Sequence, residues 1–337
     1  MKLTVLGLGC WGLVLTKLLT DNFDEVTGWS RKEDLSYELL RFKRTTKPFE
    51  VCLDEKVRIT SDLKEAIKDA DIILLVVATS AIRAVCAQLK EAGIKDNQIL
   101  VNASKGLEQG TFKRMSQVMK DELPNQKIAV LSGPTLALEV LEGQPTAACV
   151  AAEDAETAKK VQGMLAVKNK FRLYTNDDMI GVELGGSLKN VIAIAAGFLD
   201  EMKFGDNSKG ALLARGMAEI ARVSVYLGAN PSTIWGLSGM GDLIATCGSH
   251  LSRNNTVGRM LAQGKKIDDI LSELGSVAEG VKTSKAICEL ADKINIETPI
   301  SKAIYKAVYS KENSKEIFLE LMNRALKGEE NFTAKSV

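Results

Sequence analysis

The sequence predicts an α/β fold in which a doubly wound, mostly parallel sheet is followed by an all-α C-terminal domain. Up to about residue 176 of the 337 residues, short apolar runs alternate with amphipathic segments of helical period. Runs such as Ile72–Val77 are apolar on both faces, as is typical of strands covered by helices on either side. After Asp177 and Asp178, helical spacing continues without convincing strands. The alternation indicates a parallel sheet, and the change of pattern indicates a second domain.

The first part of the chain, residues 1–178, holds the predicted strands and the helices between them. Strands are expected at Lys2–Leu6, Glu25–Trp29, Asp71–Val77, Gln98–Asn102, Lys127–Leu131, Ala147–Ala152 and Phe171–Tyr174. Helices are expected at Trp11–Thr20, Ser61–Lys68, Ser80–Glu91, Thr111–Leu123 and Asp154–Leu165. Because helix-like segments lie between most of the strands, these residues are predicted to form one doubly wound domain.

The second part, residues 179–337, has helical spacing throughout. Helices are expected near residues 179–201, 207–228, 254–263, 281–292, 299–309 and 315–326. This part is therefore predicted to be an all-helical domain, and the polar residues discussed below make it the expected substrate-binding domain.

Composition restricts the class of protein. Hydrophobic residues make up 45% and charged residues 26%, and the formal net charge is +1, so no overall field attracts nucleic acid or an acidic membrane. The N-terminus has no signal-peptide pattern, and no run approaches the roughly 18 apolar residues of a membrane span. The six cysteines are dispersed and there is one histidine, so neither a disulfide framework nor a metal site is expected. These observations favour a cytoplasmic protein with reduced thiols.

A glycine-rich turn follows the first predicted strand. Gly7, Gly9 and Gly12 form the pattern G-x-G-x-x-G, which includes Cys10 and Trp11, and a helix follows directly. The first glycine permits a tight turn, the second lets backbone N–H groups approach a pyrophosphate, and the third allows close packing of helix on strand. The helix dipole favours the anion. In this context the motif predicts a Rossmann-type dinucleotide-binding site.

The end of the second predicted strand bears on the choice between NAD and NADP. A site selective for NAD places Asp or Glu there to bind the ribose 2′-hydroxyl. This chain has Arg31 and Lys32, which suit a 2′-phosphate, and Arg31 could also stack on adenine. Glu33 and Asp34 follow closely, so NAD remains open. The expected cofactor is NADP(H), NAD(H) or both.

One lysine stands alone in an apolar helical segment. Residues 184–199 carry a single charge, Lys189, and lysine is rarely buried unless it is paired or chemically active. Helical side chains lean toward the N-terminus, so Lys189 is expected to lie over Gly185 and Gly186, in a hollow open to a small ligand. Burial and nearby cations would lower its pKa toward the working range of a general acid or base. Lys189 is the predicted catalytic residue, with Asn190 beside it as a substrate ligand.

Two loops at the carboxyl ends of predicted strands are candidate substrate sites. Lys105 follows the strand at Gln98–Asn102, and Gly133 and Thr135 follow the strand at Lys127–Leu131. Ligands of open α/β sheets bind at these ends. We therefore expect the three residues to contact the substrate.

Polar residues of the second domain are a predicted anion site. Asp242 follows a glycine-rich loop, and Thr246 lies on the same face if a helix begins there. Ser252, Arg253 and Asn254 precede a helical run, so a hydroxyl, a guanidinium and a helix N-terminus converge. Arginine matches phosphate geometry bidentately, so a phosphorylated small molecule is the expected substrate.

Taken together, these segments resemble the bacterial NAD(P)-dependent glycerol-3-phosphate dehydrogenases over nearly the whole chain. The motifs are Gly7-x-Gly9-x-Trp11-Gly12, Lys105-Gly106-Leu107, Ser132-Gly133-Pro134-Thr135, Leu184-Gly185-Gly186-x-x-Lys189-Asn190-Val191, Gly239-x-Gly241-Asp242-Leu243, Ser252-Arg253-Asn254 and Glu279-Gly280. The resemblance implies reversible hydride transfer between NAD(P)H and dihydroxyacetone phosphate, giving sn-glycerol 3-phosphate for phospholipid synthesis. It also implies a cytoplasmic homodimer.

The resemblance also assigns residues to roles. It implies that Lys189 is the proton donor and acceptor. The implied substrate ligands are Lys105, Gly133, Thr135, Asp242, Ser252, Arg253 and Asn254. The implied NADPH contacts are Cys10, Trp11, Arg31, Lys105, Ala137, Arg253, Val277 and Glu279. Two residues depart from the family pattern: Cys10 replaces the usual serine in the phosphate loop, and Leu138 replaces the usual lysine before Glu139. Both departures concern cofactor affinity.

Two other functions compete with this interpretation. A related lysine-dependent dehydrogenase of β-hydroxy acids or ketopantoate would act on a carboxylate, and would have less use for the anion site around Arg253. A dinucleotide-sensing protein without turnover would leave Lys189 in its apolar helix unexplained.

Overall fold

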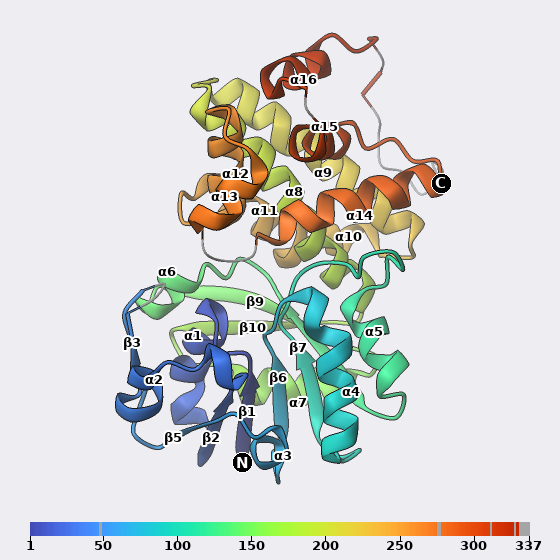
Figure 1. Ribbon diagram of the computed structural model, residues 1–337. Coiled ribbons are helices and arrows are strands. Elements are labelled where there is room, and N and C mark those ends of the chain that lie inside the picture. Colours follow the sequence, from blue (N-terminus) through green and yellow to red (C-terminus); the bar gives the residue numbers. More distant parts are fainter. Residues whose placement is uncertain (47–48, 275–277, 311, 327, 330–337) are drawn as a thin grey trace. The chain divides into compact units, whose positions relative to one another are not determined.

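The computed structural model describes residues 1–46, 49–274, 278–310, 312–326 and 328–329 (Figure 1). The chain forms two compact units. The first unit consists of Met1–Ser104 and Lys113–Met179, and the second consists of Lys105–Phe112 and Ile180–Val337. The short segment Lys105–Phe112 therefore leaves the first unit and returns to it, an excursion that no sequence pattern indicated.

The first unit is built on an eight-stranded sheet with the order β10-β9-β8-β7-β6-β1-β2-β5. Its strands are β1 (Lys2–Leu6), β2 (Glu25–Trp29), β5 (Val57–Thr60), β6 (Ile72–Leu75), β7 (Ile99–Asn102), β8 (Lys127–Ser132), β9 (Thr146–Ala152) and β10 (Phe171–Asn176). Neighbouring strands are parallel except β8 and β9, which are antiparallel. The predicted α/β class with a mostly parallel sheet is confirmed.

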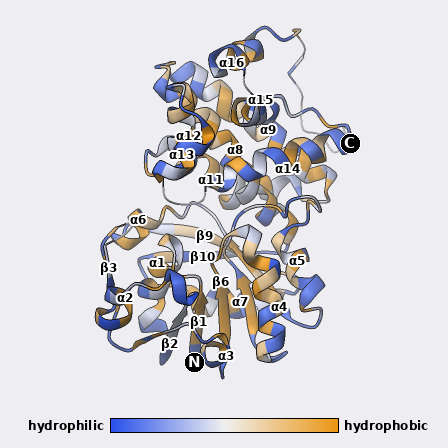
Figure 2. Cartoon of the chain, in the orientation of Figure 1, coloured by the Kyte–Doolittle hydropathy of each residue, from blue (hydrophilic) through white to orange (hydrophobic). Residues whose placement is uncertain are grey.

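Helices cover both faces of this sheet (Figure 1). They are α1 (Cys10–Leu19), α2 (Tyr37–Phe42), α3 (Leu63–Ile67), α4 (Ile82–Ala92), α5 (Met115–Glu122), α6 (Ala137–Leu141) and α7 (Ala155–Leu165). In β6, Ile72 and Leu74 enter the core that includes residues of α1 and α7, while Ile73 and Leu75 enter the core shared with α3, α4 and α5. Burial on both faces explains the uninterrupted apolar run, which Figure 2 shows in hydrophobic colours.

Some short elements of the first unit were not predicted. Strand β5 pairs with β2, and β3 (Arg44–Thr45) pairs with β4 (Val51–Cys52) in a separate antiparallel ribbon. These strands, and helix α2, are too short to show a clear period. Helix α5 begins at Met115 rather than at Thr111 as expected, because Phe112 has a φ of +59° and Arg114 is extended.

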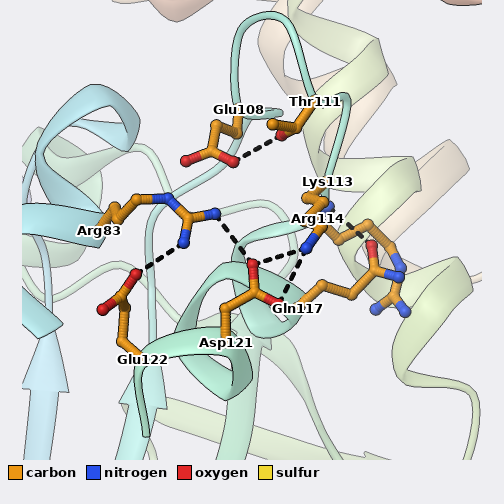
Figure 3. Close-up of polar contacts among 8 residues, drawn as sticks. All are labelled: Arg83, Glu108, Thr111, Lys113, Arg114, Gln117, Asp121 and Glu122. Carbon is orange, nitrogen blue, oxygen red and sulfur yellow. Dashed lines mark hydrogen bonds and ion pairs between the residues drawn. The ribbon is translucent and has the colours of Figure 1, made fainter.

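Ion pairs join α5 to α4 and to the segment where the chain returns to the first unit. Figure 3 shows Arg83 of α4 between two acidic residues of α5: it binds Asp121 at 3.0 Å and Glu122 at 2.7 Å. Lys113, the first residue after the excursion, binds Asp121 at 2.6 Å. Asp121 therefore ties the returning chain to both helices.

The second unit is helical. Its helices are α8 (Met179–Glu201), α9 (Asp206–Tyr226), α10 (Pro231–Ile234), α11 (Asp242–Gly248), α12 (Arg253–Ala262), α13 (Ile267–Leu274), α14 (Glu279–Lys293), α15 (Pro299–Tyr309) and α16 (Ser314–Met322). The short helices α10 and α13 were not predicted. The glycine-rich segment before Asp242 is not a loop but a π-helical turn, Leu237–Gly241. A Cβ on Gly239 would lie 1.9 Å from Ile234 O, so only glycine allows this close packing.

Helix α8 is the central helix of the second unit. Every residue from Gly181 to Phe198 is buried. By length and composition it is the one helix of the described chain that could cross a membrane, although no run of that kind was expected. However, 94% of its most apolar 18-residue window is buried inside the protein. The surrounding helices, not lipid, cover it, as expected of the core helix of a helical domain.

Candidate active site

The glycine-rich turn between β1 and α1 has the geometry of a dinucleotide loop. Gly7 has a φ of +100°, and a Cβ there would lie 2.7 Å from Val76 O. A Cβ on Gly12 would lie 1.8 Å from Gly7 O, so the third glycine permits the close approach of helix to turn. Gly9 has open space where its side chain would be, and α1 begins at Cys10 without a side-chain cap. These residues fit a pyrophosphate held by backbone N–H groups at a helix N-terminus.

The residues expected near the adenosine ribose lie at the end of β2. Arg31 is exposed, and its guanidinium binds Asp34 at 2.8 Å and Glu33 at 3.3 Å. These ion pairs raise the pKa of Arg31. Lys32 is also exposed. Glu33 and Asp34 are the acidic residues that left NAD open as a cofactor. They therefore form ion pairs with the arginine that is expected to bind the 2′-phosphate of NADP.

The other residues predicted to bind the cofactor are distributed over both units. Trp11, in the first turn of α1, meets the ring of Phe171 edge to face, with centroids 6.5 Å apart. Ala137 is the first residue of α6 in the first unit, and Glu279 is the first residue of α14 in the second. Val277 lies outside the described residues.

Gly133 and Thr135 lie in the first unit, directly after β8. Gly133 has a φ of +144°, and a Cβ there would lie 2.9 Å from Ala148 Cα on β9. The hydroxyl of Thr135 donates to Gly133 O at 3.2 Å. Glycine is thus required by both the backbone angle and the neighbouring strand, and the turn has one well-defined shape.

Lys189 is buried in the second unit and is bound by two side chains of α11. Only 6% of the residue is exposed. Its Nζ donates to Thr246 Oγ1 at 2.5 Å and lies 3.0 Å from Asp242 Oδ1. Thr246 in turn donates to Asp242 Oδ1 at 3.1 Å. The spacing of four residues on α11 therefore does place both partners on the face that meets the lysine.

Asp242 binds a second lysine. It is 2% exposed, and its Oδ2 lies 2.6 Å from Lys105 Nζ. Lys105 belongs to the excursion that joins the second unit, where Leu107 is buried in the helical core and Gly106 O accepts from Ser187 Oγ at 3.3 Å. One carboxylate thus bridges two ammonium groups that are far apart in the sequence.

Burial and the neighbouring charges bring the pKa of Lys189 close to neutral pH. Burial is the largest effect and lowers the pKa of Lys189, the charge of Asp242 raises it, and the charge of Lys105 lowers it again. The result is a pKa of about 8, well below the ordinary 10.5. A group with this pKa can both give and take a proton under physiological conditions, as a general acid/base must.

The space beside Lys189 is not the hollow that was expected at Gly185. A Cβ on Gly185 would lie 3.0 Å from both Gly239 Cα and Ser238 O. The backbone of the π-helical turn therefore fills this space, and Gly185 serves close packing rather than ligand access. The expectation is wrong for Gly185 because helical spacing shows which side chains are missing but not which other segment takes their place.

Asn190 and Asn254, both predicted substrate ligands, bind each other. Asn254 Nδ2 donates to Asn190 Oδ1 at 3.0 Å, and Asn254 Oδ1 accepts from Gly280 N at 3.0 Å. A Cβ on Gly280 would lie 2.6 Å from Asn190 O, so the start of α14 can come this close to α8 only because residue 280 is glycine. The two amides thus link α8, α12 and α14.

Ser252 and Arg253 lie at the start of α12. The Ser252 hydroxyl caps the helix by accepting from Asn255 N at 3.2 Å. Arg253 is the first helical residue and is exposed. The arrangement offers a guanidinium and the N-terminal end of a ten-residue helix to an anion.

The structure thus brings part of the predicted site together within the second unit. Lys105, Lys189, Asp242 and Thr246 form one cluster of direct contacts. Sequence reasoning did not predict that Gly280 N binds the side chain of Asn254. The Glu279-Gly280 motif was the available signal, but it gave no partner. Among the described residues, no group of three potential ligands could hold a metal ion.

Two family models match the chain. The N-terminal model of NAD-dependent glycerol-3-phosphate dehydrogenase matches residues 2–158, and the C-terminal model matches residues 178–319. The glycerol-3-phosphate dehydrogenase [NAD(P)+] of Enterococcus faecalis is 44% identical over 98% of each chain. That of Pediococcus pentosaceus is 46% identical over 96% of this chain and 97% of its own length.

A solved structure extends the similarity to the fold. The crystal structure of glycerol-3-phosphate dehydrogenase from Coxiella burnetii has a TM-score of 0.90 and 32% sequence identity. The match covers 96% of this chain and 99% of that one. The yeast enzyme GPD1 is similar with a TM-score of 0.79 and 26% identity. The resemblance noted in the sequence is confirmed: this chain belongs to the NAD-dependent glycerol-3-phosphate dehydrogenase family.

Proposed function

We propose that this protein is an NAD(P)-dependent oxidoreductase that interconverts dihydroxyacetone phosphate and sn-glycerol 3-phosphate. Membership of the family supports the reaction, and the buried cluster of Lys189, Asp242, Thr246 and Lys105 carries the chemical argument. The glycine-rich turn supports the dinucleotide. We further propose that residues 1–178 form the dinucleotide-binding domain and residues 179–337 the substrate-binding domain, with Lys105–Phe112 contributed to the latter.

Lys189 is the proposed general acid/base. In the direction of reduction, a bound nicotinamide would supply the hydride that the carbonyl carbon of the substrate receives. The ammonium of Lys189 gives its proton to the oxygen as negative charge develops there. In the reverse direction the neutral amine takes the hydroxyl proton. Asp242 and Thr246 hold Nζ in place, so that the proton is transferred at a fixed atom.

The start of α12 is the proposed phosphate site. Arg253 offers two parallel N–H donors, and the helix N-terminus adds a favourable dipole. Ser252 fixes the first turn through its cap. Lys105, Asn190, Asn254, Gly133 and Thr135 are the further proposed substrate ligands. The proposed NAD(P) contacts are Gly7, Gly9, Cys10, Trp11, Gly12, Arg31, Lys32, Lys105, Ala137, Arg253, Val277 and Glu279.

We also propose that the protein is a cytoplasmic homodimer that supplies glycerol phosphate for phospholipid synthesis. All six cysteines are free thiols, which agrees with a reducing compartment. Sedimentation of the purified protein measures the oligomeric state directly, and a monomer at assay concentrations would contradict this part of the proposal.

The reaction is tested by following NADPH and NADH oxidation with three substrates: dihydroxyacetone phosphate, ketopantoate and a β-keto acid. Rapid turnover of the phosphorylated ketone alone is expected. Preference for a carboxylate would instead identify the related lysine-dependent dehydrogenases, and no turnover with any substrate would identify a binding protein. In the same assay Lys189→Ala should lower kcat by about 10²- to 10⁴-fold. Lys285→Ala, which removes an exposed lysine of α14, is the matched control and should leave kcat unchanged.

A further inference from the structure

The residues proposed to act on the substrate lie on separate helices of the second unit. Lys189 is on α8, Asp242 and Thr246 are on α11, and Arg253 begins α12. The ion pair and hydrogen bond of Lys189 join α8 to α11, but they do not reach α12. The Asn254–Asn190 hydrogen bond joins α8 to α12 beside these groups, and the contacts farther along the crossing of the two helices set the rest of their relative position.

Helices α8 and α12 cross at two glycines. A Cβ on Gly258 of α12 would lie 1.8 Å from Ile194 O of α8. A Cβ on Gly197 of α8 would lie 1.9 Å from Asn255 O of α12. Backbone therefore lies against backbone, which fixes how near the helices are. Smooth glycine contacts alone leave sliding and rotation along the crossing poorly determined, because they have no side chains to interlock.

Asn255 is the side chain at this crossing that joins all three helices. It is fully buried, with 0% of the residue exposed. Its Nδ2 donates to Asp200 Oδ2 of α8 at 3.0 Å and approaches Cys247 O of α11 at 3.5 Å. Cys247 directly follows Thr246, and Asn255 is two residues from Arg253. The amide of Asn255, on the first turn of α12, thus contacts the C-terminal part of α8 and also α11, the helix that holds Lys189 in place.

The surroundings fix the orientation of this amide. Arg259 Nε donates to Asn255 Oδ1 at 2.9 Å, and Lys209 Nζ donates to Asp200 Oδ1 at 2.8 Å. Burial opposes ionisation of Asp200, but the hydrogen bonds from Lys209 and Asn255, together with the charges of Lys209 and of Arg259 at 3.5 Å, outweigh it, so that its pKa is lowered. The carboxylate can only accept and the guanidinium can only donate. The amide nitrogen must therefore face Asp200, and the amide oxygen must face Arg259.

We infer that Asn255 is a positioning residue for substrate recognition: its amide, held between Asp200 and Arg259, sets the first turn of α12, and hence Arg253, relative to Lys189. The inference rests on the proposed function, because it takes Arg253 as the phosphate ligand. Asn255 itself needs no contact with substrate. Its loss should therefore affect the phosphorylated substrate and leave the chemistry at Lys189 intact.

The test exchanges the donor and the acceptor of the hydrogen bond between Asn255 and Asp200. In Asn255→Asp, a carboxylate oxygen faces Asp200 Oδ2 where an N–H group donated, so the hydrogen bond that joins the two helices is replaced by a repulsive contact. Asp200→Asn keeps an acceptor oxygen for Asn255 but loses the ion pairs with Lys209 and Arg259, so it is the control for the loss of charge at residue 200. In the double variant Asp200→Asn/Asn255→Asp, the amide of residue 200 donates to the new carboxylate, which still accepts from Arg259. The total charge equals that of the wild type.

We expect Asn255→Asp to lower kcat/KM for dihydroxyacetone phosphate by about 10- to 100-fold, the effect of a displacement near 1 Å. The double variant should recover most of this loss, and Asp200→Asn should show little. The kcat/KM for unphosphorylated dihydroxyacetone, which offers Arg253 no phosphate, should be unchanged in all three. A purely structural role would instead lower both substrates together.

Other outcomes overturn the inference. These are an equal loss with both substrates, no loss in Asn255→Asp, and no recovery in the double variant. If Asn255→Asp does not fold, the double variant decides, because it must fold and match Asp200→Asn in its preference for the phosphorylated substrate. Wild-type protein that shows no preference for dihydroxyacetone phosphate refutes the proposed function, and the inference with it. In contrast, a wild type with that preference and a double variant without it refutes the inference alone.

Discussion

Asp242→Asn tests whether one buried carboxylate sets the pH at which Lys189 works. The carboxylate lies 3.0 Å from the ammonium, and the two side chains are 2% and 7% exposed. With an effective dielectric constant of about 20, Coulomb's law gives roughly 5–6 kcal/mol for this distance. One pKa unit corresponds to about 1.4 kcal/mol, so even a quarter of that energy shifts the pKa by about one unit.

The sign of the effect follows from the charge. Asp242 favours the ammonium form, whereas burial and Lys105 disfavour it, and together they give a pKa of about 8. Without the carboxylate the pKa of Lys189 falls below this value. Reduction of the ketone needs the ammonium as acid, so kcat in the wild type should fall as the pH rises through about 8. In Asp242→Asn the fall should begin at a pH lower by about one unit or more.

The assay is the initial rate of NADPH oxidation at saturating dihydroxyacetone phosphate, across neutral and alkaline pH. Saturation matters because Asp242→Asn also removes the ion pair between Asp242 and Lys105 and should raise KM. Glu219→Gln is the control: Glu219 is a buried carboxylate of the same unit that accepts from Ile300 and Ser301 instead. It should leave the alkaline limb in place. An unchanged limb in Asp242→Asn, or one moved to higher pH, would refute this account of Lys189.

Three further predictions follow from other parts of the molecule. Arg31→Ala should raise the KM for NADPH much more than that for NADH, and equal changes in steady-state kinetics would refute a 2′-phosphate contact. Burial raises the pKa of Glu219 to about 7, against hydrogen bonds that lower it. Because the folded value exceeds the ordinary 4.5, this group should cost roughly 3 kcal/mol of stability as the pH rises from about 4.5 through 7. Urea unfolding at both ends of this range should show that slope, and Glu219→Gln should lack it. Gly258→Ala should destabilise the protein by about 1–3 kcal/mol or more through overpacking. Gly163→Ala on α7, where nothing lies within 4 Å, should instead gain about 0.5–1 kcal/mol in the same urea measurement.

Much of the first unit could be predicted from local pattern. A strand buried on both faces must be apolar throughout, as Ile72–Leu75 is. Gly12 is needed for a steric reason that acts within a few residues, its contact with Gly7 O. Motifs that are spread along the whole chain also identified the family correctly. The antiparallel pairing of β8 with β9 was not foreseen, because an apolar strand has the same composition in either direction.

Burial of Lys189 in an apolar helix could be predicted from the sequence, because apart from Asn190 its neighbours along the helix are nonpolar or small. The partners of the lysine, in contrast, depend on how segments far apart in the chain pack together. Asp242 and Thr246 come from α11, and the second ammonium comes from an excursion whose packing no local period records. The supposed hollow at Gly185 is filled by the π-helical turn. Periodicity reports which face of a segment is buried, whereas partners far apart in sequence are chosen by packing, and their charges then set the pKa.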